Sequence, residues 1–415
     1  MRTTRLAFGL VGLLGLSLVN AIPAGAQGTT YTTIERGRYL VNAGDCASCH
    51  TDQGGKPYAG GLAVPTPFGV IYSTNITPDP ATGIGKWSEQ DFYKAMHNGI
   101  DRDGKHLYPA FPYPWFTKVS RDDVGAIKAF LDTLTPVRQA NKPTELHWPL
   151  NMREVMAGWN ELYFHEGALK ADPTKSEQWN RGAYLVEGLG HCGACHTATN
   201  ELGAPKAGET LKGGDFGEHW YAPSLTSGLR DGLGGWSAAE IVEYLKTGAN
   251  AKSAAAGPMA EVIKNSTQYL NDADLNAVAA YLKDFPVGKA KVTTTIDINK
   301  QALSRGEALY VDNCTGCHME NGEGLAQAFP PLKGSSAVQA KTPDTVIHVV
   351  LAGAKMAATP GKPTGLAMPA FDWKLDDKEV ADLVNYIRNA WGNHASLTSV
   401  DTVSKVRRDV EHGGG

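Results

Sequence analysis

The sequence predicts an all-α protein built from three tandem repeats, and three observations lead to this prediction. The motif Cys-x-x-Cys-His occurs three times along the 415 residues. A pattern of apolar residues spaced three and four apart follows each copy of the motif, as in an amphipathic helix. Runs of alternating apolar and polar residues, which would indicate β-strands, are not found. We therefore expect three small helical units joined by linkers.

Length and composition favour an ordinary globular protein of several domains. Hydrophobic residues make up 42% and charged residues 20% of the chain, and these values disfavour disorder and a coiled coil. The formal net charge of −4 gives no electrostatic support for a nucleic-acid partner. All six cysteines belong to the three motifs, so none is left for a disulfide framework or a thiol nucleophile.

The first 26 residues have the pattern of a secretory signal peptide. Arg2 and Arg5 precede an apolar run from Leu6 to Val19, and Ala24-Gly25-Ala26 supplies a cleavage site of small residues. The apolar run is shorter than the ~20 residues that a bilayer-spanning helix needs. No later segment has ~18 consecutive apolar residues, so we expect an exported chain that does not cross a membrane by itself.

Each repeat has about 100 residues, which is small for a hydrophobic core of its own. A large apolar cofactor bound covalently in each repeat would fill that core. The predicted division of the chain is a signal peptide at 1–26, a first unit at 30–150, a linker at 151–175, a second unit at 176–287, a third unit at 298–394 and a tail at 395–415.

Helix signals recur at matching places in the units. Each unit ends in a pattern with acidic residues in its first turn and an apolar stripe at helical spacing. These closing patterns cover Ser120–Leu134, Asn271–Phe285 and Asp376–Trp391. In the first two units Ser88 and Ser237 follow a glycine-rich segment and a tryptophan, and we expect each serine to cap the next helix.

The motif Cys-x-x-Cys-His is the attachment signature of c-type haem. The two thiols add to the vinyl groups of the porphyrin, and the adjacent histidine becomes the proximal iron ligand. A thioredoxin-like redox pair explains neither the histidines nor the three repeats, and a zinc site would pair two such elements. The sequence thus predicts three covalent haem c groups. The attaching residues would be Cys46, Cys49, Cys192, Cys195, Cys314 and Cys317, with proximal ligands His50, His196 and His318.

The sixth ligand decides whether an iron transfers electrons or does chemistry, and methionine gives a closed iron of raised potential. In the third unit Met368-Pro369 lies in a loop shortly before the last helix, and we favour Met368 over Met356 as the ligand. In the second unit Met259 follows Pro258 in the matching loop and is the only methionine there. We therefore predict Met259 and Met368 as axial ligands.

The first unit departs from this pattern because Phe111 stands where a methionine is expected. Met96 aligns with apolar positions of the other units, so we assign it to the core. His106, Met152 and Met156 remain candidates for the sixth ligand of the first haem. The sequence does not choose among these three, and an open iron is a further alternative.

Several segments of the chain match the pattern of a known family. They are Gly44–His50, Tyr108–Ala110, Met156–Asn160, Gly257–Val262, Ser266–Leu270 and Met368–Phe371. Nearly the whole chain after residue 26 resembles the tri-haem cytochrome c subunits of membrane-bound periplasmic dehydrogenases that oxidise alcohols, gluconate, sorbitol or fructose. Similar subunits accompany some periplasmic molybdenum hydroxylases. Alcohol dehydrogenase subunits are expected to carry methionine where Phe111 stands, so this residue departs from the family pattern.

The resemblance implies three tandem class I cytochrome c domains. It also implies a separate catalytic dehydrogenase subunit, either a quinoprotein, a flavoprotein or a molybdenum hydroxylase. The cytochrome would pass electrons to ubiquinone or a downstream cytochrome, in the periplasm and peripherally attached to the outer face of the cell membrane.

The residues themselves favour an electron relay. The sequence has no Gly-x-Gly-x-x-Gly after a strand for a dinucleotide and no second metal cluster, so we expect no substrate-oxidising site. The alternative is a haem enzyme whose open first iron acts on peroxide or another small oxidant.

The predicted tail carries apolar residues at helical spacing, namely Leu397, Val400, Val403, Val406 and Val410. They could form one face of a C-terminal helix that lies on a membrane or on a partner. The alternative, packing on the chain's own surface or disorder, is favoured.

Overall fold

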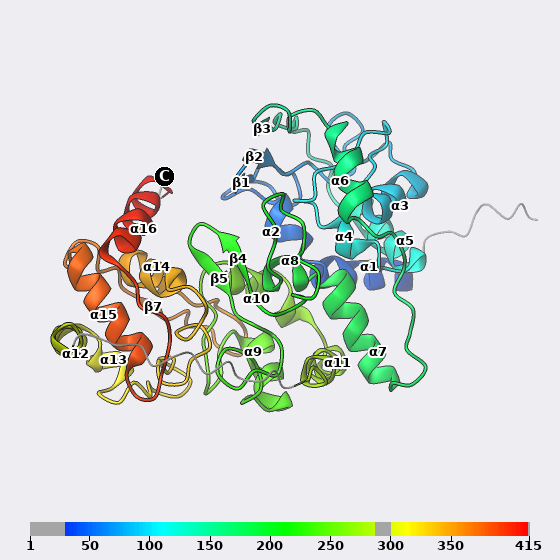
Figure 1. The fold of residues 1–415 in the computed structure, drawn as a ribbon. Helices are drawn as coiled ribbons and strands as arrows, with labels where there is room; N and C mark the ends of the chain where they lie inside the picture. The colour runs from blue at the N-terminus through cyan, green and yellow to red at the C-terminus, as the bar shows by residue number, and fades with distance from the viewer. Residues whose placement is uncertain (1–29, 287–299, 414–415) are drawn as a thin grey trace, which may run out of the picture.

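Three mainly helical units follow one another in the structure, a computed structural model that describes residues 30–286 and 300–413. The predicted signal peptide at 1–26 lies outside the described residues. The second unit lies between the first and the third (Figure 1). Within the two described ranges, no helix is long and apolar enough to cross a membrane.

The first unit opens with a long helix and closes with another that crosses it. With the segment that follows, its elements are α1 (Tyr31–Ala43), α2 (Cys46–His50), β1 (Ala63–Thr66), β2 (Gly69–Tyr72), α3 (Glu89–Asn98), α4 (Tyr113–Phe116), α5 (Arg121–Leu131), β3 (Glu145–Leu146) and α6 (Val155–Tyr163). Helix α6 occupies part of the predicted linker at 151–175.

The second unit repeats this order. Its elements are α7 (Glu177–Tyr184), a π-helical turn η1 (Leu185–Leu189), α8 (Gly193–His196), β4 (Gly214–Gly217), β5 (Trp220–Ala222), α9 (Ala238–Thr247), α10 (Pro258–Asn265), a 3₁₀ turn η2 (Thr267–Tyr269) and α11 (Asp272–Lys283). Helices α7 and α11 pack against each other as α1 and α5 do.

The third unit has the same opening and closing pair, and a C-terminal helix follows the closing helix. Its elements are α12 (Lys300–Asn313), α13 (Thr315–His318), α14 (Asp344–Ala352), β6 (Ala354–Lys355), β7 (Ala367–Met368), α15 (Asp377–Asn389) and α16 (Val400–Gly413). The chain segment between the second and third units, residues 287–299, lies outside the described residues.

The opening and closing helices of each unit cross at a glycine. A Cβ atom on Gly37 would lie 1.9 Å from the carbonyl oxygen of Ala126, a distance that no side chain tolerates. Gly182 and Gly306 meet the closing helices of their own units in the same way, at 2.0 Å and 2.2 Å. The close crossing is therefore a shared property of the three units, and it requires glycine at that position.

The predicted helix starts are confirmed. Ser88 and Ser237 each form a capping box, in which the serine side chain accepts from a backbone N–H three residues later. The closing helices α5, α11 and α15 begin one residue after Ser120, Asn271 and Asp376, whose side chains cap them. Acidic residues in the first turns add a favourable interaction with the helix dipole.

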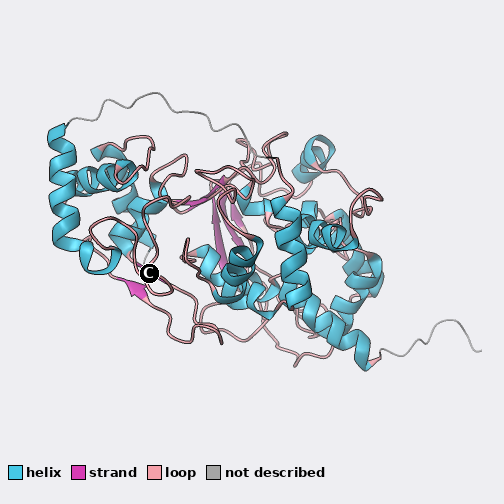
Figure 2. Ribbon diagram, turned by 90° about the horizontal axis from the view of Figure 1, so that it is seen from below, coloured by secondary structure: helices cyan, strands magenta, loops and turns pink. Residues whose placement is uncertain are grey.

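The prediction of an all-α protein is only partly correct, because each unit also carries a small antiparallel sheet (Figure 2). The first sheet has the order β1-β2-β3, with Val64 opposite Ile71 and Val70 opposite Glu145. The other two sheets are the pairs β4-β5 and β6-β7. Strands of two to four residues are too short to produce a readable alternation in the sequence.

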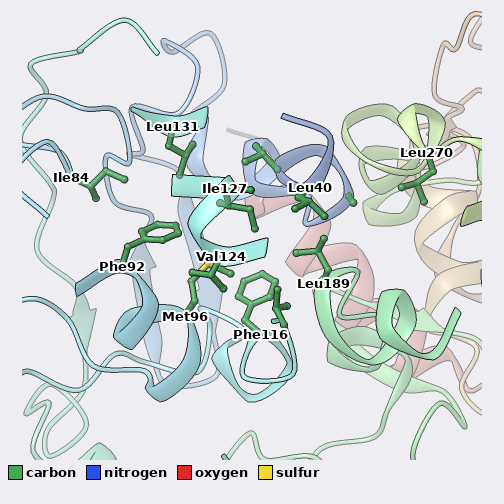
Figure 3. Close-up of a cluster of buried hydrophobic side chains, with 14 of the residues drawn as sticks. Leu40, Ile84, Phe92, Met96, Phe116, Val124, Ile127, Leu131, Leu189 and Leu270 are labelled. Carbon is green, nitrogen blue, oxygen red and sulfur yellow. The ribbon is translucent and has the colours of Figure 1, made fainter. Parts of the chain in front are cut away.

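The first and second units share one hydrophobic core. Leu40 of α1 and Ile127 of α5 are buried in the same cluster as Leu189, Leu270 and Leu275 of the second unit (Figure 3). Burial of a leucine side chain contributes about 1.5–3 kcal/mol to folding. Because residues of both units fill this cluster, we expect the folding of the first unit to depend on the second.

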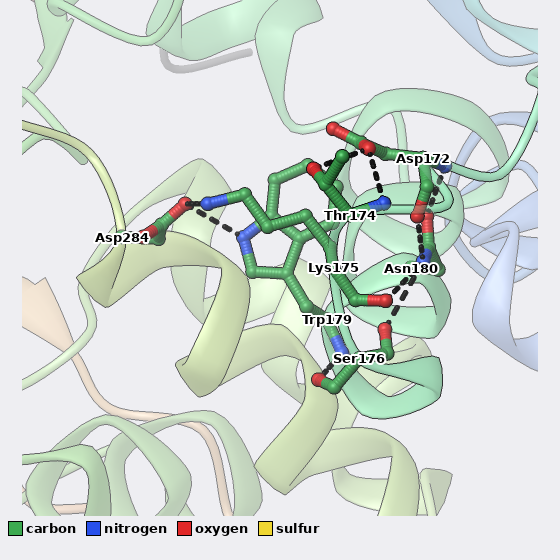
Figure 4. Close-up of polar contacts among 7 residues, drawn as sticks. All are labelled: Asp172, Thr174, Lys175, Ser176, Trp179, Asn180 and Asp284. Atoms are coloured by element: carbon green, nitrogen blue, oxygen red, sulfur yellow. Dashed lines mark hydrogen bonds and ion pairs between the residues drawn. The ribbon is translucent and has the colours of Figure 1, made fainter.

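The end of the predicted linker is fastened to the second unit by polar contacts (Figure 4). The ammonium of Lys175 and the indole N–H of Trp179 both donate to the Asp284 carboxylate, at 2.6 Å and 3.0 Å. The Asn180 amide donates to the carbonyl oxygen of Asp172, at 2.9 Å. The two contacts with Asp284 join the start of α7 to the end of α11.

The predicted tail at 395–415 includes helix α16, which packs on α14 and α15. Val403 and Val406 are fully buried in the core of the third unit. Arg407 donates to the Asp377 carboxylate at 2.6 Å and to two backbone carbonyl oxygens. The predicted apolar face of this helix therefore covers its own unit, whereas Leu397 and Val400 at its start are exposed.

Candidate haem sites

The three Cys-x-x-Cys-His motifs each form one short helical turn directly after the opening helix of their unit. The first motif is helix α2, and the second and third motifs include α8 and α13. A single helical turn places both sulfur atoms and the imidazole near one another, because residues three and four apart lie on the same face. None of the six cysteines forms a disulfide bond.

Each motif histidine is oriented by a backbone carbonyl group. Nδ1 of His50 lies 2.6 Å from the oxygen of Thr74, and Nδ1 of His196 lies 2.6 Å from that of Pro223. Nδ1 of His318 lies 3.0 Å from the oxygen of Pro330. A carbonyl oxygen only accepts, so the proton is on Nδ1 and the lone pair of Nε2 is free to bind a metal.

Burial favours the neutral forms of these groups. It lowers the pKa of all three motif histidines, which keeps their imidazoles neutral and able to act as ligands. Burial also raises the pKa of Cys46 to about 12 and that of Cys192 to about 11, so these thiols are protonated at neutral pH. Two thiols and one imidazole with a free Nε2 are the donor set that haem c requires, and the residues present therefore fit this group.

The axial methionine predicted for the second unit lies in a helix rather than in the predicted loop. Met259 is in the first turn of α10, after Gly257, which has a positive φ of 51°. A Cβ atom on Gly257 would lie 2.4 Å from the ring of Trp220, so only glycine lets the chain pass this ring. Met259 is half-buried against Tyr244 and the small core that contains Ala357 of the third unit.

The axial methionine predicted for the third unit lies in a strand. Met368 is in β7, where it stands opposite Ala354, and it packs against the core of the third unit. Gly353, which ends helix α14, lies beside it, and a Cβ atom there would meet the Met368 carbonyl oxygen at 2.6 Å. The competing Met356 directly follows β6, and its N–H donates to the carbonyl oxygen of Leu366 at 3.0 Å.

In the first unit, Phe111 lies in the loop before α4 and its ring is 5.4 Å from that of Phe116. Met96 is 4% exposed in the core of the unit, as predicted. Met156 in α6 is 5% exposed, and Met152 lies in the turn before α6 with 43% of its surface exposed.

His106 is half-buried, and residues near Met152 and Met156 hold it in place. Arg153 donates to the backbone carbonyl oxygen of His106 at 3.0 Å, and the Asn160 amide nitrogen lies 3.4 Å from Nδ1 of its ring. The structure thus brings His106 and Met156 to the contact between α6 and the loop that contains Phe111.

The first and second motifs lie close together across the boundary of their units. The Asn265 amide at the end of α10 donates to the Ser48 hydroxyl, which lies between the two cysteines of the first motif, at 2.8 Å. The thiols of Cys49 and Cys195 are near enough to interact electrostatically. On the other side, Trp115 of α4 lies against Gly193 of the second motif, where a Cβ atom would meet its Nε1 at 2.7 Å.

Contacts also connect the second and third units. The Trp220 ring lies 4.3 Å from the His348 ring, and the Tyr221 N–H donates to the Thr345 hydroxyl at 2.8 Å. His219 Nε2 lies 2.8 Å from the carboxylate of Asp409 in α16. The second unit is therefore in direct contact with both of the others.

Sequence reasoning missed the carbonyl acceptors of the motif histidines and the residues that join the first two motifs. The acceptors stand 24, 27 and 12 residues after their histidines, and any residue type supplies a backbone carbonyl. Asn265 and Trp115 have no fixed spacing from a motif. A usable signal lay beside Asn265, because the family segments Gly257–Val262 and Ser266–Leu270 stand on either side of it.

The geometry defines a protein with three haem-attachment units, and comparison with known proteins agrees. The sequence profile of the cytochrome c family matches residues 34–135, 180–285 and 303–391, which is one match for each unit. The chain belongs to the cytochrome c family.

Three relatives match nearly the full length of the chain. The gluconate 2-dehydrogenase cytochrome c subunit of Pantoea cypripedii is 41% identical over 91% of this chain and 90% of its own length. The cytochrome c subunit of the quinone-type alcohol dehydrogenase of Gluconobacter oxydans is 40% identical over 96% of this chain and 87% of its own length. The fructose dehydrogenase cytochrome subunit of Gluconobacter japonicus is 36% identical over 90% of this chain and 82% of its own length.

Three family matches and these relatives establish the cofactor and the class of function. The protein carries three covalently bound haem c groups and is an electron-transfer protein of the kind that serves dehydrogenases. The alternative of a haem enzyme acting on peroxide is the less well supported of the two hypotheses.

Proposed function

We propose that the protein accepts electrons from a catalytic dehydrogenase subunit and passes them through its three haems to ubiquinone or a downstream cytochrome. The proposal rests on one structural observation above all. Three haem-attachment motifs lie in three units in contact, and the first motif contacts the second unit through the hydrogen bond that the Asn265 amide donates to the Ser48 hydroxyl. Such an arrangement suits transfer between neighbouring haems.

The proposal assigns the attaching and ligating residues by their chemistry. The thiols would hold the haems through Cys46, Cys49, Cys192, Cys195, Cys314 and Cys317, and the proximal ligands would be His50, His196 and His318. Met259 and Met368 would be the axial ligands of the second and third haems. Bound haem supplies the one-electron chemistry, while the chain supplies the imidazoles and holds their Nδ1 protons on backbone carbonyls.

The catalytic partner would be a quinoprotein, a flavoprotein or a molybdenum hydroxylase. The names of the relatives point to an alcohol, a sugar or a sugar acid as the substrate of that partner. We place the complex in the periplasm, peripherally attached to the outer face of the cell membrane. The apolar face of α16 is not available for this attachment, because Val403 and Val406 are buried within the third unit.

The experiment is purification of the tagged holoprotein from native membranes in mild detergent. Ethanol, gluconate or fructose is then added, and the reduced haem band is followed together with dye-linked dehydrogenase activity. We expect a dehydrogenase activity that travels with the cytochrome and reduces its haems when its substrate is added. A cytochrome that elutes alone, or that stays oxidised while the accompanying activity reduces a dye, would contradict the proposal.

A further inference from the structure

Large apolar side chains are exposed together on one side of the first unit. Trp148 is 78% exposed and Met152 43%, and both lie in the segment that leads into α6. Leu162 in α6 is 67% exposed, and Leu202 of the second unit is 50% exposed. We call these four side chains the α6 surface. Helix α6 and strand β3, which frame it, lie at the top of the first unit in Figure 1.

Three segments that are far apart in the sequence meet at the α6 surface. The indole N–H of Trp159 in α6 donates to the carbonyl oxygen of Leu202 at 3.0 Å and holds a turn of the second unit on the helix. Phe68, between β1 and β2, contacts the other two segments. Its carbonyl oxygen accepts from the N–H of His147 at 3.0 Å, and its ring lies 3.8 Å from the position of a Cβ atom on Gly203. The packing of the first two units therefore builds this surface.

The core of the fold does not account for these exposed side chains. The buried cluster beneath α6 consists of Tyr108, Tyr113, Met156, Trp159 and Ala204. The four side chains of the α6 surface are not part of that cluster. Exposed apolar residues that gather in one place without serving the core are typical of an interaction surface.

Exposed carboxylates lie beside the α6 surface. Glu154 directly precedes α6, Glu161 lies in it and Glu201 is the neighbour of Leu202, and all three are exposed. An anionic lipid surface repels these charges. A protein face with lysines or arginines around an apolar centre attracts them. The charges therefore favour a basic protein over a membrane as the partner of this surface.

The cation of this segment is engaged by the chain itself. Arg153 is the only lysine or arginine in residues 147–162. Its guanidinium donates to the carbonyl oxygen of His106 at 3.0 Å and lies 5.2 Å from the centre of the Tyr108 ring. Arg153 thus points toward the body of the first unit, and the acidic side chains face the solvent.

The α6 surface is close to the first haem site. Phe111, which stands where the other units have their predicted axial methionines, packs against the same cluster as Met156 of α6. The Tyr113 hydroxyl also donates to the Asn160 amide oxygen of this helix. A helix with its side chains is about 10–12 Å thick, so a protein docked on α6 would be separated from the Phe111 loop by about one helix.

We propose that the α6 surface is the docking site of an electron-accepting basic cytochrome, whose exposed haem edge is apolar and ringed by lysines. One electron passes from the ferrous first haem to the ferric haem of the docked protein, and no bond is formed or broken. This inference rests on the proposed function, which names a downstream cytochrome as one of two acceptors. It adds the place at which that acceptor binds.

The binding test uses the complete oxidised holoprotein and immobilised mitochondrial cytochrome c as the basic probe, with surface plasmon resonance at low and high salt. Binding should weaken as salt rises, because the attraction between exposed charges is screened. Glu161→Lys should raise the Kd about fivefold at low salt and less at high salt. Trp148→Ser should raise it about tenfold at both salt concentrations, because it removes an apolar anchor.

Two matched controls lie outside the α6 surface. Tyr31→Ser removes another aromatic side chain of the first unit that is 78% exposed, and Glu307→Lys reverses an exposed charge on α12 of the third unit. Both variants should bind the probe as the wild type does. A wild type that does not bind, or equal binding by the wild type, Trp148→Ser and Glu161→Lys, would overturn the inference. A larger effect of Glu307→Lys would also overturn it.

A vesicle assay tests the membrane as the occupant. Vesicles of phosphatidylethanolamine and phosphatidylglycerol should bind the wild type and Trp148→Ser equally little, and binding that only the wild type shows would overturn the inference.

Electron transfer is measured with the purified complex and its substrate. Reduction of excess mitochondrial cytochrome c should be slower in the Trp148→Ser and Glu161→Lys variants. Ferricyanide, a small oxidant that needs no docking surface, should be reduced at the wild-type rate. Slower reduction of ferricyanide in these variants would show damage to the haems and overturn the inference. A wild-type complex whose haems stay oxidised with substrate would instead contradict the proposed function, whatever the binding test shows.

Discussion

The Tyr39 hydroxyl of the first unit donates a 2.6 Å hydrogen bond to the carboxylate of Asp274 in the second unit. Asp274 is also held by Arg181 of its own unit through two hydrogen bonds, at 2.7 Å and 2.8 Å. These contacts lower the pKa of Asp274 although its burial acts in the opposite direction. The carboxylate is therefore charged and fully partnered at the boundary between the units.

The same contact occurs in the reverse direction. The Tyr184 hydroxyl of the second unit donates to Asp123 of the first at 2.6 Å, and Arg36 pairs with that carboxylate at 2.6 Å. Tyr39 and Tyr184 both stand two residues after the crossing glycine of their opening helices, where the third unit has Ala308. The first two units thus exchange equivalent hydrogen bonds across a pseudo-twofold boundary.

Loss of these two hydroxyls should weaken the boundary. Each Tyr→Phe change removes one hydrogen bond to a charged group, so Tyr39→Phe and Tyr184→Phe should each cost about 1.5–3 kcal/mol. Unfolding in denaturant is followed by circular dichroism. The loss of stability in the double variant should be close to the sum of the losses in the two single variants. As a control, Tyr72→Phe removes an exposed hydroxyl that contacts Glu145 and should change stability little. Unchanged stability in the double variant would contradict the reciprocal exchange.

The same boundary predicts a dependence on alkaline pH. Burial and the bond to Asp123 raise the pKa of Tyr184 from 10.0 to about 12. The unfolded chain therefore loses this proton first, and the stabilisation is present below pH 10 and is lost as pH rises toward 12. Denaturant unfolding at several pH values should show this decline, and Tyr184→Phe should reduce it. An identical decline in the variant would exclude Tyr184 as its source.

Removal of single haems should have unequal consequences. The first unit shares its core with Leu189, Leu270 and Leu275 of the second, so replacing Cys192 and Cys195 by serine should remove the second haem and destabilise the first unit as well. The matched change in the third unit should remove one haem and leave the other two in place. Haem staining and limited proteolysis would report both results, and independent behaviour of all three units would contradict the shared core.

The axial methionines predict a redox effect without loss of haem. A thioether ligand favours reduced iron, so Met259→Leu and Met368→Leu should each lower the potential of one haem while all three haems stay attached. Met356→Leu is the matched control, since Met356 directly follows β6, the strand that pairs with the strand of Met368, and the change should leave the potentials unchanged. A spectroscopic redox titration measures this effect. An unchanged titration of Met368→Leu would reject its assignment.

The sequence was sufficient to predict what depends on local spacing. Cys-x-x-Cys-His occupies one helical turn, and the closing helices begin at capping residues, so both could be recognised directly. The small sheets could not be recognised in the sequence, because strands such as β6 and β7 contain only two residues each. The contact of Asn265 with Ser48 joins residues 217 positions apart and depends on how two units pack. The role of Arg388 could not be predicted from local spacing either. Its fully buried guanidinium donates to four backbone carbonyl oxygens of the third unit.

The central claim is that electrons from a dehydrogenase pass through the haems of this chain, and rapid mixing tests it most directly. The purified complex in its oxidised state is mixed with the substrate of its catalytic subunit, and the reduced haem band is followed in time with a ubiquinone analogue present or absent. The account predicts haem reduction at least as fast as steady-state turnover, followed by reoxidation when the quinone is added. Haems that stay oxidised during turnover, or that are reduced more slowly than the complex turns over, would contradict it.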